Sequence, residues 1–201
     1  MEKHVIINIG RQFGSGGKSV AIALGEKLGI PVFDNELIIK AAEQSGIKAE
    51  FFHKSDEKKH LFRLGNLFGS NRYGNYTSNG INESELFKIQ SDAIRSIAEQ
   101  GSAIFVGRAS DYVLRDMDTL DVFITAPLED RCRRVSERLG ISTEEAEKLI
   151  AAKDRGRKEY YDFFSFGDNW GRAANYDLCI DSSRLGIEKT ADFIIEFGRL
   201  K

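Results

Sequence analysis

The residues with the clearest chemistry lie in one short segment, residues 14–19, which reads Gly-Ser-Gly-Gly-Lys-Ser. Glycines let the backbone fold inward so that successive N–H groups point at one anion, and the start of a following helix adds partial positive charge. The Lys18 ammonium could reach the β- and γ-phosphates of a nucleotide, and the Ser19 hydroxyl could bind magnesium. The segment predicts a phosphate-binding loop whose backbone contacts come from Gly14, Ser15, Gly16, Gly17 and Lys18.

One position departs from the strict phosphate-loop pattern. The pattern requires glycine six residues before the lysine, and here that residue is Gln12. The alternative is a glycine-rich turn between a strand and a helix that binds no ligand. Three of the four residues before Lys18 are glycine, and Lys-Ser opens the next helical period, so the pattern favours phosphate.

Short unbroken apolar runs alternate with helical periods along the chain. The runs predict buried strands at residues 5–9, 31–33, 103–106, 122–124 and 178–180. Between them, amphipathic periods predict helices that include residues 20–28, 86–97, 128–139 and 187–195. Alternating strands and helices indicate an α/β fold, in which helices cover both faces of a parallel sheet. Ligands bind beyond the carboxyl edge of such a sheet, where the glycine-rich loop falls.

An arginine follows the third strong strand directly. Arg108 stands at the carboxyl end of residues 103–106, and its planar guanidinium could bind a phosphate through two parallel hydrogen bonds. The alternative is a surface arginine paired with Asp111 or Asp116. A position beside the phosphate loop favours a ligand contact.

A basic cluster follows a predicted helix start. Residues 142–145, Ser-Thr-Glu-Glu, form a capping box, and the cluster Lys153, Arg155, Arg157 and Lys158 lies downstream. Cations that close over a transferring phosphate neutralise its charge and exclude water, so we predict a lid over about residues 153–172. The alternative is a solvated helix face.

Asp34 follows the short apolar run 31–33. Its carboxylate could bind magnesium through water or orient an acceptor hydroxyl. It could equally cap a helix that begins near Glu36. The sequence leaves both interpretations open.

Composition limits the class of protein. The 201 residues carry 29 Lys and Arg against 31 Asp and Glu, so a nucleic-acid or membrane partner is not expected. Cys132 and Cys179 lack metal-ligand spacing and fall in apolar patterns, which predicts two core residues in a reducing cytoplasm. We expect one domain over residues 1–201, with an insertion at about 46–84.

Taken together, these motifs resemble those of nucleoside monophosphate kinases and, more narrowly, the cytidylate kinase-like family. The resemblance is carried by residues 11–17, 28–34 and 106–109, by Asp154 and Arg157 with Tyr160-Tyr161, and by Trp170 with residues 176–179. It implies a P-loop three-layer α/β/α sandwich with a five-stranded parallel sheet, an acceptor-binding insertion and a lid. It also implies transfer of the γ-phosphoryl group of ATP, bound with Mg²⁺, to a nucleoside monophosphate.

The resemblance also implies roles for particular residues. Lys18, Arg108, Arg155 and Arg157 would be catalytic, Arg131 would face the adenine of ATP, and Ser19 and Asp34 would hold the magnesium ion. No covalent protein nucleophile is expected, because phosphoryl transfer depends on positioning and charge stabilisation.

The chain departs from cytidylate kinases at several of these motifs. Gln12 replaces a loop glycine, and Val106 and Ala109 replace the acids around Arg108. These changes favour the alternative of a regulatory module that binds ATP without transferring phosphate, whereas the basic cluster of the predicted lid argues against it. Gly156 and Glu159 replace residues that read the pyrimidine. A kinase acting on a non-nucleotide alcohol is a further alternative, and the oligomeric state is left open.

Overall fold

The computed structural model describes residues 4–44, 83–167 and 169–200. Nearly all of the insertion predicted at about 46–84 lies outside these residues. Its last two residues, Glu83 and Ser84, instead belong to the helix α5 (Glu83–Gln100). None of the helices in the described ranges is long and apolar enough to cross a membrane.

The predicted parallel sheet is confirmed. Its five strands lie in the order β2-β3-β1-β4-β5, and every neighbouring pair is parallel. The strands are β1 (Ile6–Arg11), β2 (Val32–Phe33), β3 (Ala103–Val106), β4 (Leu120–Thr125) and β5 (Leu178–Asp181). In register, Ile9 of the central strand lies beside Val106 of β3 and Val122 of β4.

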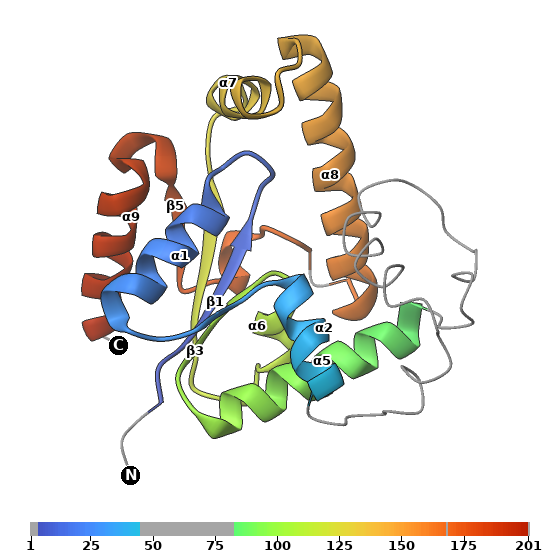
Figure 1. The fold of residues 1–201 in the computed structure, drawn as a ribbon, viewed down its shortest axis with the longest axis vertical. Coiled ribbons are helices and arrows are strands. Elements are labelled where there is room, and N and C mark those ends of the chain that lie inside the picture. The colour runs from blue at the N-terminus through green and yellow to red at the C-terminus, as the bar shows by residue number, and fades with distance from the viewer. Residues whose placement is uncertain (1–3, 45–82, 168, 201) are drawn as a thin grey trace.

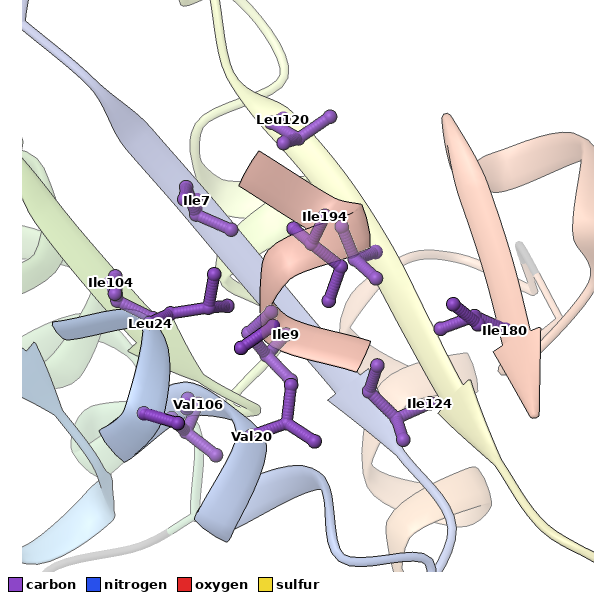
Figure 2. Packing of buried hydrophobic residues seen from close by; sticks show 14 residues of the cluster. Ile7, Ile9, Val20, Leu24, Ile104, Val106, Leu120, Ile124, Ile180 and Ile194 are labelled. Carbon is purple, nitrogen blue, oxygen red and sulfur yellow. The ribbon is translucent and has the colours of Figure 1, made fainter. Parts of the chain in front are cut away.

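Helices cover both faces of the sheet, as Figure 1 shows. One face is covered by α1 (Gly17–Leu28) and α9 (Ser182–Arg199), and the other by α2 (Asn35–Gln44), α5 and α6 (Ser110–Val113). The chain also forms α7 (Leu128–Leu139) and α8 (Thr143–Phe164). Successive strand side chains point to opposite faces, so neighbouring residues enter different cores. Ile7 packs with α1 and α9, whereas Ile6 packs with α2, α5 and α6. Figure 2 shows the first of these cores, in which Ile9, Val20 and Leu24 are fully buried.

α7 and α8 form a separate unit with its own small core. Cys132 and Val135 of α7 pack against Ala146 and Ile150 of α8. The predicted capping box is present: the Ser142 hydroxyl accepts from the N–H of Glu145, whose carboxylate accepts from the N–H of Ser142. From there α8 continues without interruption for 22 residues. The predicted basic cluster, Lys153, Arg155, Arg157 and Lys158, therefore lies on a continuous helix.

One of the two cysteine predictions is wrong. Cys132 is buried as expected, but Cys179 is exposed. β5 is one of the two edge strands of the sheet, and of its four residues only Ile180 is buried. An apolar run at a sheet edge is not covered on both sides, which a run of sequence letters does not reveal.

Candidate phosphate-binding site

The loop between β1 and α1 has a backbone that requires glycine. Gly14 and Gly16 both have φ of 79°, in the left-handed region. At Gly17 there is no room for a side chain, since a Cβ atom would lie 2.6 Å from the Cβ of Arg11. The Ser15 hydroxyl and N–H both bond to the carbonyl oxygen of Gln12, at 2.9 and 3.4 Å, which closes the turn. The loop thus has the inward-wrapped form that a phosphate site needs.

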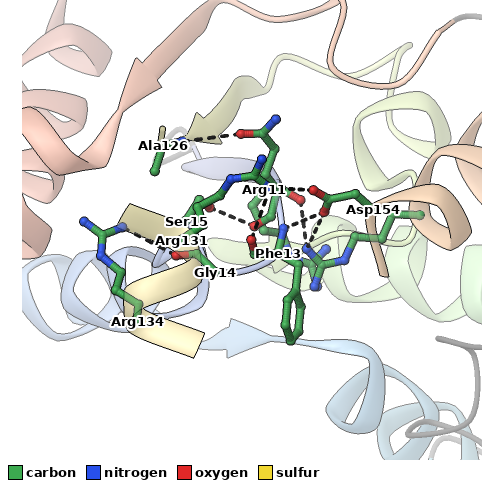
Figure 3. A network of polar contacts seen from close by, with 10 residues as sticks. Arg11, Phe13, Gly14, Ser15, Ala126, Arg131, Arg134 and Asp154 are labelled. Carbon is green, nitrogen blue, oxygen red and sulfur yellow. Dashed lines mark hydrogen bonds and ion pairs between the residues drawn. The ribbon is translucent and has the colours of Figure 1, made fainter. Parts of the chain in front are cut away.

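Gln12, which replaces the glycine of the strict pattern, does not block the loop with its side chain. Its backbone N–H donates to the carbonyl of Ile124 at 3.0 Å, and its side-chain oxygen accepts from the N–H of Ala126 at 3.4 Å. Ile124 lies near the end of β4 and Ala126 directly follows that strand; Figure 3 shows the contact with Ala126. The Gln12 side chain is therefore held at the carboxyl end of β4.

On the side of α7 and α8, the loop is held by an ion pair and a set of hydrogen bonds. The Asp154 carboxylate accepts from the N–H of Phe13 at 2.6 Å and from the Arg131 guanidinium at 2.6 Å. Arg131 also donates to the carbonyl of Phe13 at 3.4 Å, and Arg134 donates to that of Gly14 at 3.5 Å (Figure 3). The Ser182 hydroxyl from α9 bonds to the carbonyl of Ser15. These contacts fix the loop before any ligand arrives.

The structure gives Arg131 a positioning role. Its side chain is only 10% exposed and is paired with Asp154 beneath the loop. The adenine contact predicted for Arg131 remains a prediction. No local pattern indicates a role for Asp154 or Arg134, because their partners are 141 and 120 residues away in the chain.

Lys18 and Asp34 form an ion pair at the mouth of the loop. Their Nζ and Oδ2 atoms are 2.7 Å apart, with the Lys18 side chain 66% exposed and that of Asp34 17% exposed. The other oxygen of Asp34 accepts from the N–H groups of Glu36 and Leu37 at 3.1 and 3.2 Å. Asp34 therefore caps α2 and also faces the loop lysine, so the two interpretations of this residue are compatible. Ser19 is exposed in the first turn of α1.

Electrostatics keep Asp34 ionised. Burial alone would raise the pKa of this carboxyl group, but the Lys18 ammonium and the two N–H donors of α2 outweigh burial. The net result is a pKa below the usual value. An anionic oxygen is thus available beside Lys18 at neutral pH.

Arg108 projects from an unusual turn after β3. Gly107, Arg108 and Ala109 all have positive φ, at 77°, 63° and 50°. A left-handed conformation costs a non-glycine residue about 1 kcal/mol or more, so this turn is maintained by its surroundings. The turn carries the Arg108 guanidinium over the ring of Tyr160 at 4.8 Å. Tyr160 lies on α8, so this contact joins the end of β3 to the predicted lid.

The alternative partners considered for Arg108 are engaged elsewhere. Asp116 binds Arg95 through two hydrogen bonds of 2.7 and 3.1 Å. Asp111 accepts from the Tyr161 hydroxyl at 2.7 Å. The ligand contact of Arg108 remains a prediction.

The basic cluster on α8 divides into members with different surroundings. Arg157 reaches the loop, where it donates to the carbonyl of Arg11 at 3.0 Å and lies 5.4 Å from the Phe13 ring. Lys158 pairs with Asp162 on the same helix, in agreement with the solvated-face alternative. Arg155 is exposed. Burial, with added repulsion from Arg108 and Arg138, lowers the pKa of Arg157 to about 10.

Sequence analysis assigned no role to Arg11, the last residue of β1. Its side chain crosses Gly17 and ends at Gly107, where a Cβ atom would lie only 1.7 Å from its Nη1 atom. The loop start and the turn that carries Arg108 therefore meet at this side chain. No local signal could have shown this, because the direction of the side chain depends on the sheet.

Fold and loop together define a class, the P-loop α/β proteins of the kinase type. Shikimate kinase from Bacteroides thetaiotaomicron shares the fold with a TM-score of 0.57 and 16% identity, over 98% of this chain and 99% of that one. The chain belongs to the cytidylate kinase-like family, whose model matches residues 6–184.

Two relatives resemble the chain over most of their length. A cytidylate kinase from Methanopyrus kandleri is 29% identical over 196 residues, which cover 92% of this chain and 89% of that protein. The crystal structure of an uncharacterized protein from Eubacterium ventriosum has a TM-score of 0.76 and 29% identity, over 99% of this chain and 100% of that one.

Proposed function

We propose that this protein is an ATP-dependent kinase that transfers the γ-phosphoryl group of Mg-ATP to a nucleoside monophosphate. The observation that carries the proposal is the position of three cations: Lys18 in the loop, Arg157 bonded to the carbonyl of Arg11 where the loop begins, and Arg108 close enough to Arg157 to lower its pKa. Membership of the cytidylate kinase-like family supports a nucleotide as the acceptor. Arginines at the end of β3 and on α8 suit an acceptor that carries its own negative charge.

The loop provides the donor site. The N–H groups of residues 14–18 would contact the β- and γ-phosphates, which the start of α1 also attracts. The Lys18 side chain is mostly exposed and can turn from Asp34 to the γ-phosphate. As a result, the ion pair seen here would be exchanged for a contact with the donor.

The oxygen atoms at the mouth of the loop fit a magnesium ion. Ser19 offers a hydroxyl and Asp34 an ionised carboxylate, and Mg²⁺ prefers oxygen ligands together with substrate phosphates. When bound, the ion would neutralise charge on the donor phosphates. Val106 and Ala109 are buried and apolar, so the acids that would occupy these positions in cytidylate kinases have no counterpart there.

The transfer needs no covalent protein intermediate. An oxygen of the acceptor phosphate forms the new bond to the γ-phosphorus atom while the bond to the β-phosphate oxygen breaks, and ADP leaves. Arg108 would hold the acceptor and Arg157 would stabilise the charge in transit. Arg155 would join them only if α8 moves on closure. Because both substrates of this reaction are small molecules in solution, we propose that the protein is cytoplasmic.

An acceptor screen tests the proposal. The purified protein would be incubated with Mg-ATP and ribo- or deoxyribonucleoside monophosphates, and the diphosphate product measured together with ADP. We expect product from at least one monophosphate. ATP binding without product from any acceptor would favour the regulatory module that the Gln12, Val106 and Ala109 departures suggest. Product from a non-nucleotide alcohol alone would favour the alternative of a kinase that acts on such alcohols.

A further inference from the structure

The Arg11 side chain packs closely against two glycines at the edge of the candidate site. Its aliphatic portion lies against Gly17 at the start of α1, and its guanidinium lies against Gly107 at the end of β3. A side chain at either glycine would overlap it. Two glycines on separate elements thus leave room for one arginine, at the edge of the sheet where the phosphate loop lies.

Two other arginines approach the same point. The Arg157 guanidinium donates to the carbonyl of Arg11 at 3.0 Å, and Arg108 follows Gly107 directly. Burial and then the charges of Arg157 and Arg108 lower the pKa of Arg11 well below the usual range. The three guanidinium groups are therefore close enough to repel one another.

The carboxylates near Arg11 do not balance this charge. Asp34 and Asp154 both act on Arg11, but Asp34 is paired with Lys18, and Asp154 is paired with Arg131 and, at 3.9 Å, with Arg157. Within the described ranges, neither Arg11 nor Arg108 forms an ion pair with a carboxylate. Three like charges of which two have no carboxylate partner oppose folding, so such a cluster is typical of a functional site.

We propose that Arg11 completes a three-arginine subsite, with Arg108 and Arg157, that binds the phosphate group of the acceptor and so selects phosphate monoesters. The inference rests on the proposed function. The Arg11 guanidinium ends at Gly107, directly after β3, whereas Arg131 holds the loop from the α7 side. The second anion would therefore lie outside the loop that holds the donor phosphates.

The chemistry favours a dianionic phosphate over a carboxylate. Three guanidinium groups present many N–H donors, and a phosphate monoester offers three terminal oxygens with nearly two negative charges. A carboxylate has two oxygens and one charge. Arg11 would thus exclude acceptors that carry only a carboxylate or a neutral hydroxyl.

Calorimetric titration with inorganic phosphate tests the subsite directly. Saturating Mg²⁺ with a non-hydrolysable ATP analogue fills both the β- and the γ-phosphate positions of the loop, so the added phosphate reports the second anion site. Arg11→Met preserves length and apolar packing but removes the charge, and Arg11→Lys restores the charge without the planar fork. We expect Arg11→Met to bind phosphate about 10- to 100-fold more weakly, as for lost hydrogen bonds to charged groups, with Arg11→Lys in between. Arg199→Ala, on the exposed end of α9, is the matched control.

Thermal unfolding without anions separates this role from a structural one. A binding arginine is repelled by its neighbours in the empty site, so Arg11→Met should melt at the same temperature as the wild type or higher. Added phosphate should then raise the melting temperature of the wild type more than that of the variant. Unchanged phosphate affinity in Arg11→Met would overturn the proposal, as would a lower melting temperature with the phosphate response intact.

The two proposals fail differently. If no monophosphate is phosphorylated but phosphate binding depends on Arg11, the anion subsite stands and the transfer reaction does not. If a monophosphate is phosphorylated equally well by the wild type and Arg11→Met, the kinase stands and Arg11 is not part of its acceptor site.

Discussion

The two sides of the phosphate loop differ in how their charges are partnered. On the α7 and α8 side, Arg131 and Asp154 are buried, paired at 2.6 Å and bonded to the loop backbone. On the β3 side, Arg11 and Arg108 have no carboxylate partner among the described residues, and Lys18 is paired but mostly exposed. Charges with ion-pair partners stabilise a structure, whereas charges without such partners are typical of a ligand-binding site. The first side therefore positions the loop, and the second is the side that we expect to bind and react.

Removing Lys18 should separate activity from stability most sharply. Lys18→Ala should lower turnover at least ~100-fold, because a cation at the transferring phosphate contributes about 3–4 kcal/mol to the transition state. Its melting temperature should hardly change, since the side chain is largely exposed. Steady-state kinetics and thermal unfolding measure the two effects. Lys27→Ala, at the other end of α1 and paired with Glu188 and Asp192, is the control. Normal turnover in Lys18→Ala would remove the phosphate-loop assignment.

Asp154→Ala should mainly lower the stability of the fold, in contrast to Lys18→Ala, which should mainly lower turnover. It leaves Arg131 buried without its partner and the N–H of Phe13 without an acceptor, which should cost about 3 kcal/mol of unfolding free energy. Urea denaturation measures this loss, with Glu147→Gln on the exposed face of α8 as the control. Full stability in Asp154→Ala would mean that this side does not support the loop.

Arg157 contacts both sides of the loop, and its variant should show whether it acts in catalysis or in ATP binding. Arg157→Ala should lower kcat more than it weakens ATP binding, by about 10-fold or more, because a cation that neutralises the transferring charge acts mainly in the transition state. Kinetics combined with ATP titration make the distinction, and Lys148→Ala on the same helix is the control. A loss confined to ATP affinity would assign Arg157 to ground-state binding.

Base selection should be weaker than phosphate selection. Gly156 and Glu159 occupy the positions that read the pyrimidine in cytidylate kinases, so we expect CMP, UMP and dCMP to differ by roughly tenfold or less, about 1.4 kcal/mol. Ratios of kcat/KM across a monophosphate panel provide the measurement. Sharp selectivity for CMP would place base recognition in residues outside the described ranges.

The smallest expected effect concerns the Lys18–Asp34 pair. The pKa of Asp34 is lower in the folded protein than its unfolded value of about 4, so the ionised group stabilises the fold above that pH. This contribution is lost as the pH falls through the folded-state pKa. Because Lys18 is so exposed, it should not exceed about 1 kcal/mol. Asp34→Asn can still cap α2, so the stability difference from the wild type should vanish at acidic pH. A difference that persists there would point to the cap and not the charge.

Features that depend on near neighbours in the chain could be predicted from the sequence. The run 103–106 is β3 to the residue, and the capping box at Ser142 starts α8 as expected. The glycine-rich loop lies between β1 and α1, with Lys18 at its mouth. In each case hydrophobic period, cap or glycine content acts within a few residues, so the local pattern decides the outcome.

The arrangement of charges around the loop was decided by the tertiary structure alone. Asp154 bonds to Phe13 across 141 residues, and Arg157 bonds to the carbonyl of Arg11 across 146. Cys179 is exposed because β5 became the edge of the sheet, and Arg11 reaches Gly107 because β1 lies beside β3. The sequence by itself determined that a phosphate loop would form on a parallel sheet. Which cations would surround it, and which would stay unpaired, depended on strand order and helix packing, since these set where each long side chain ends.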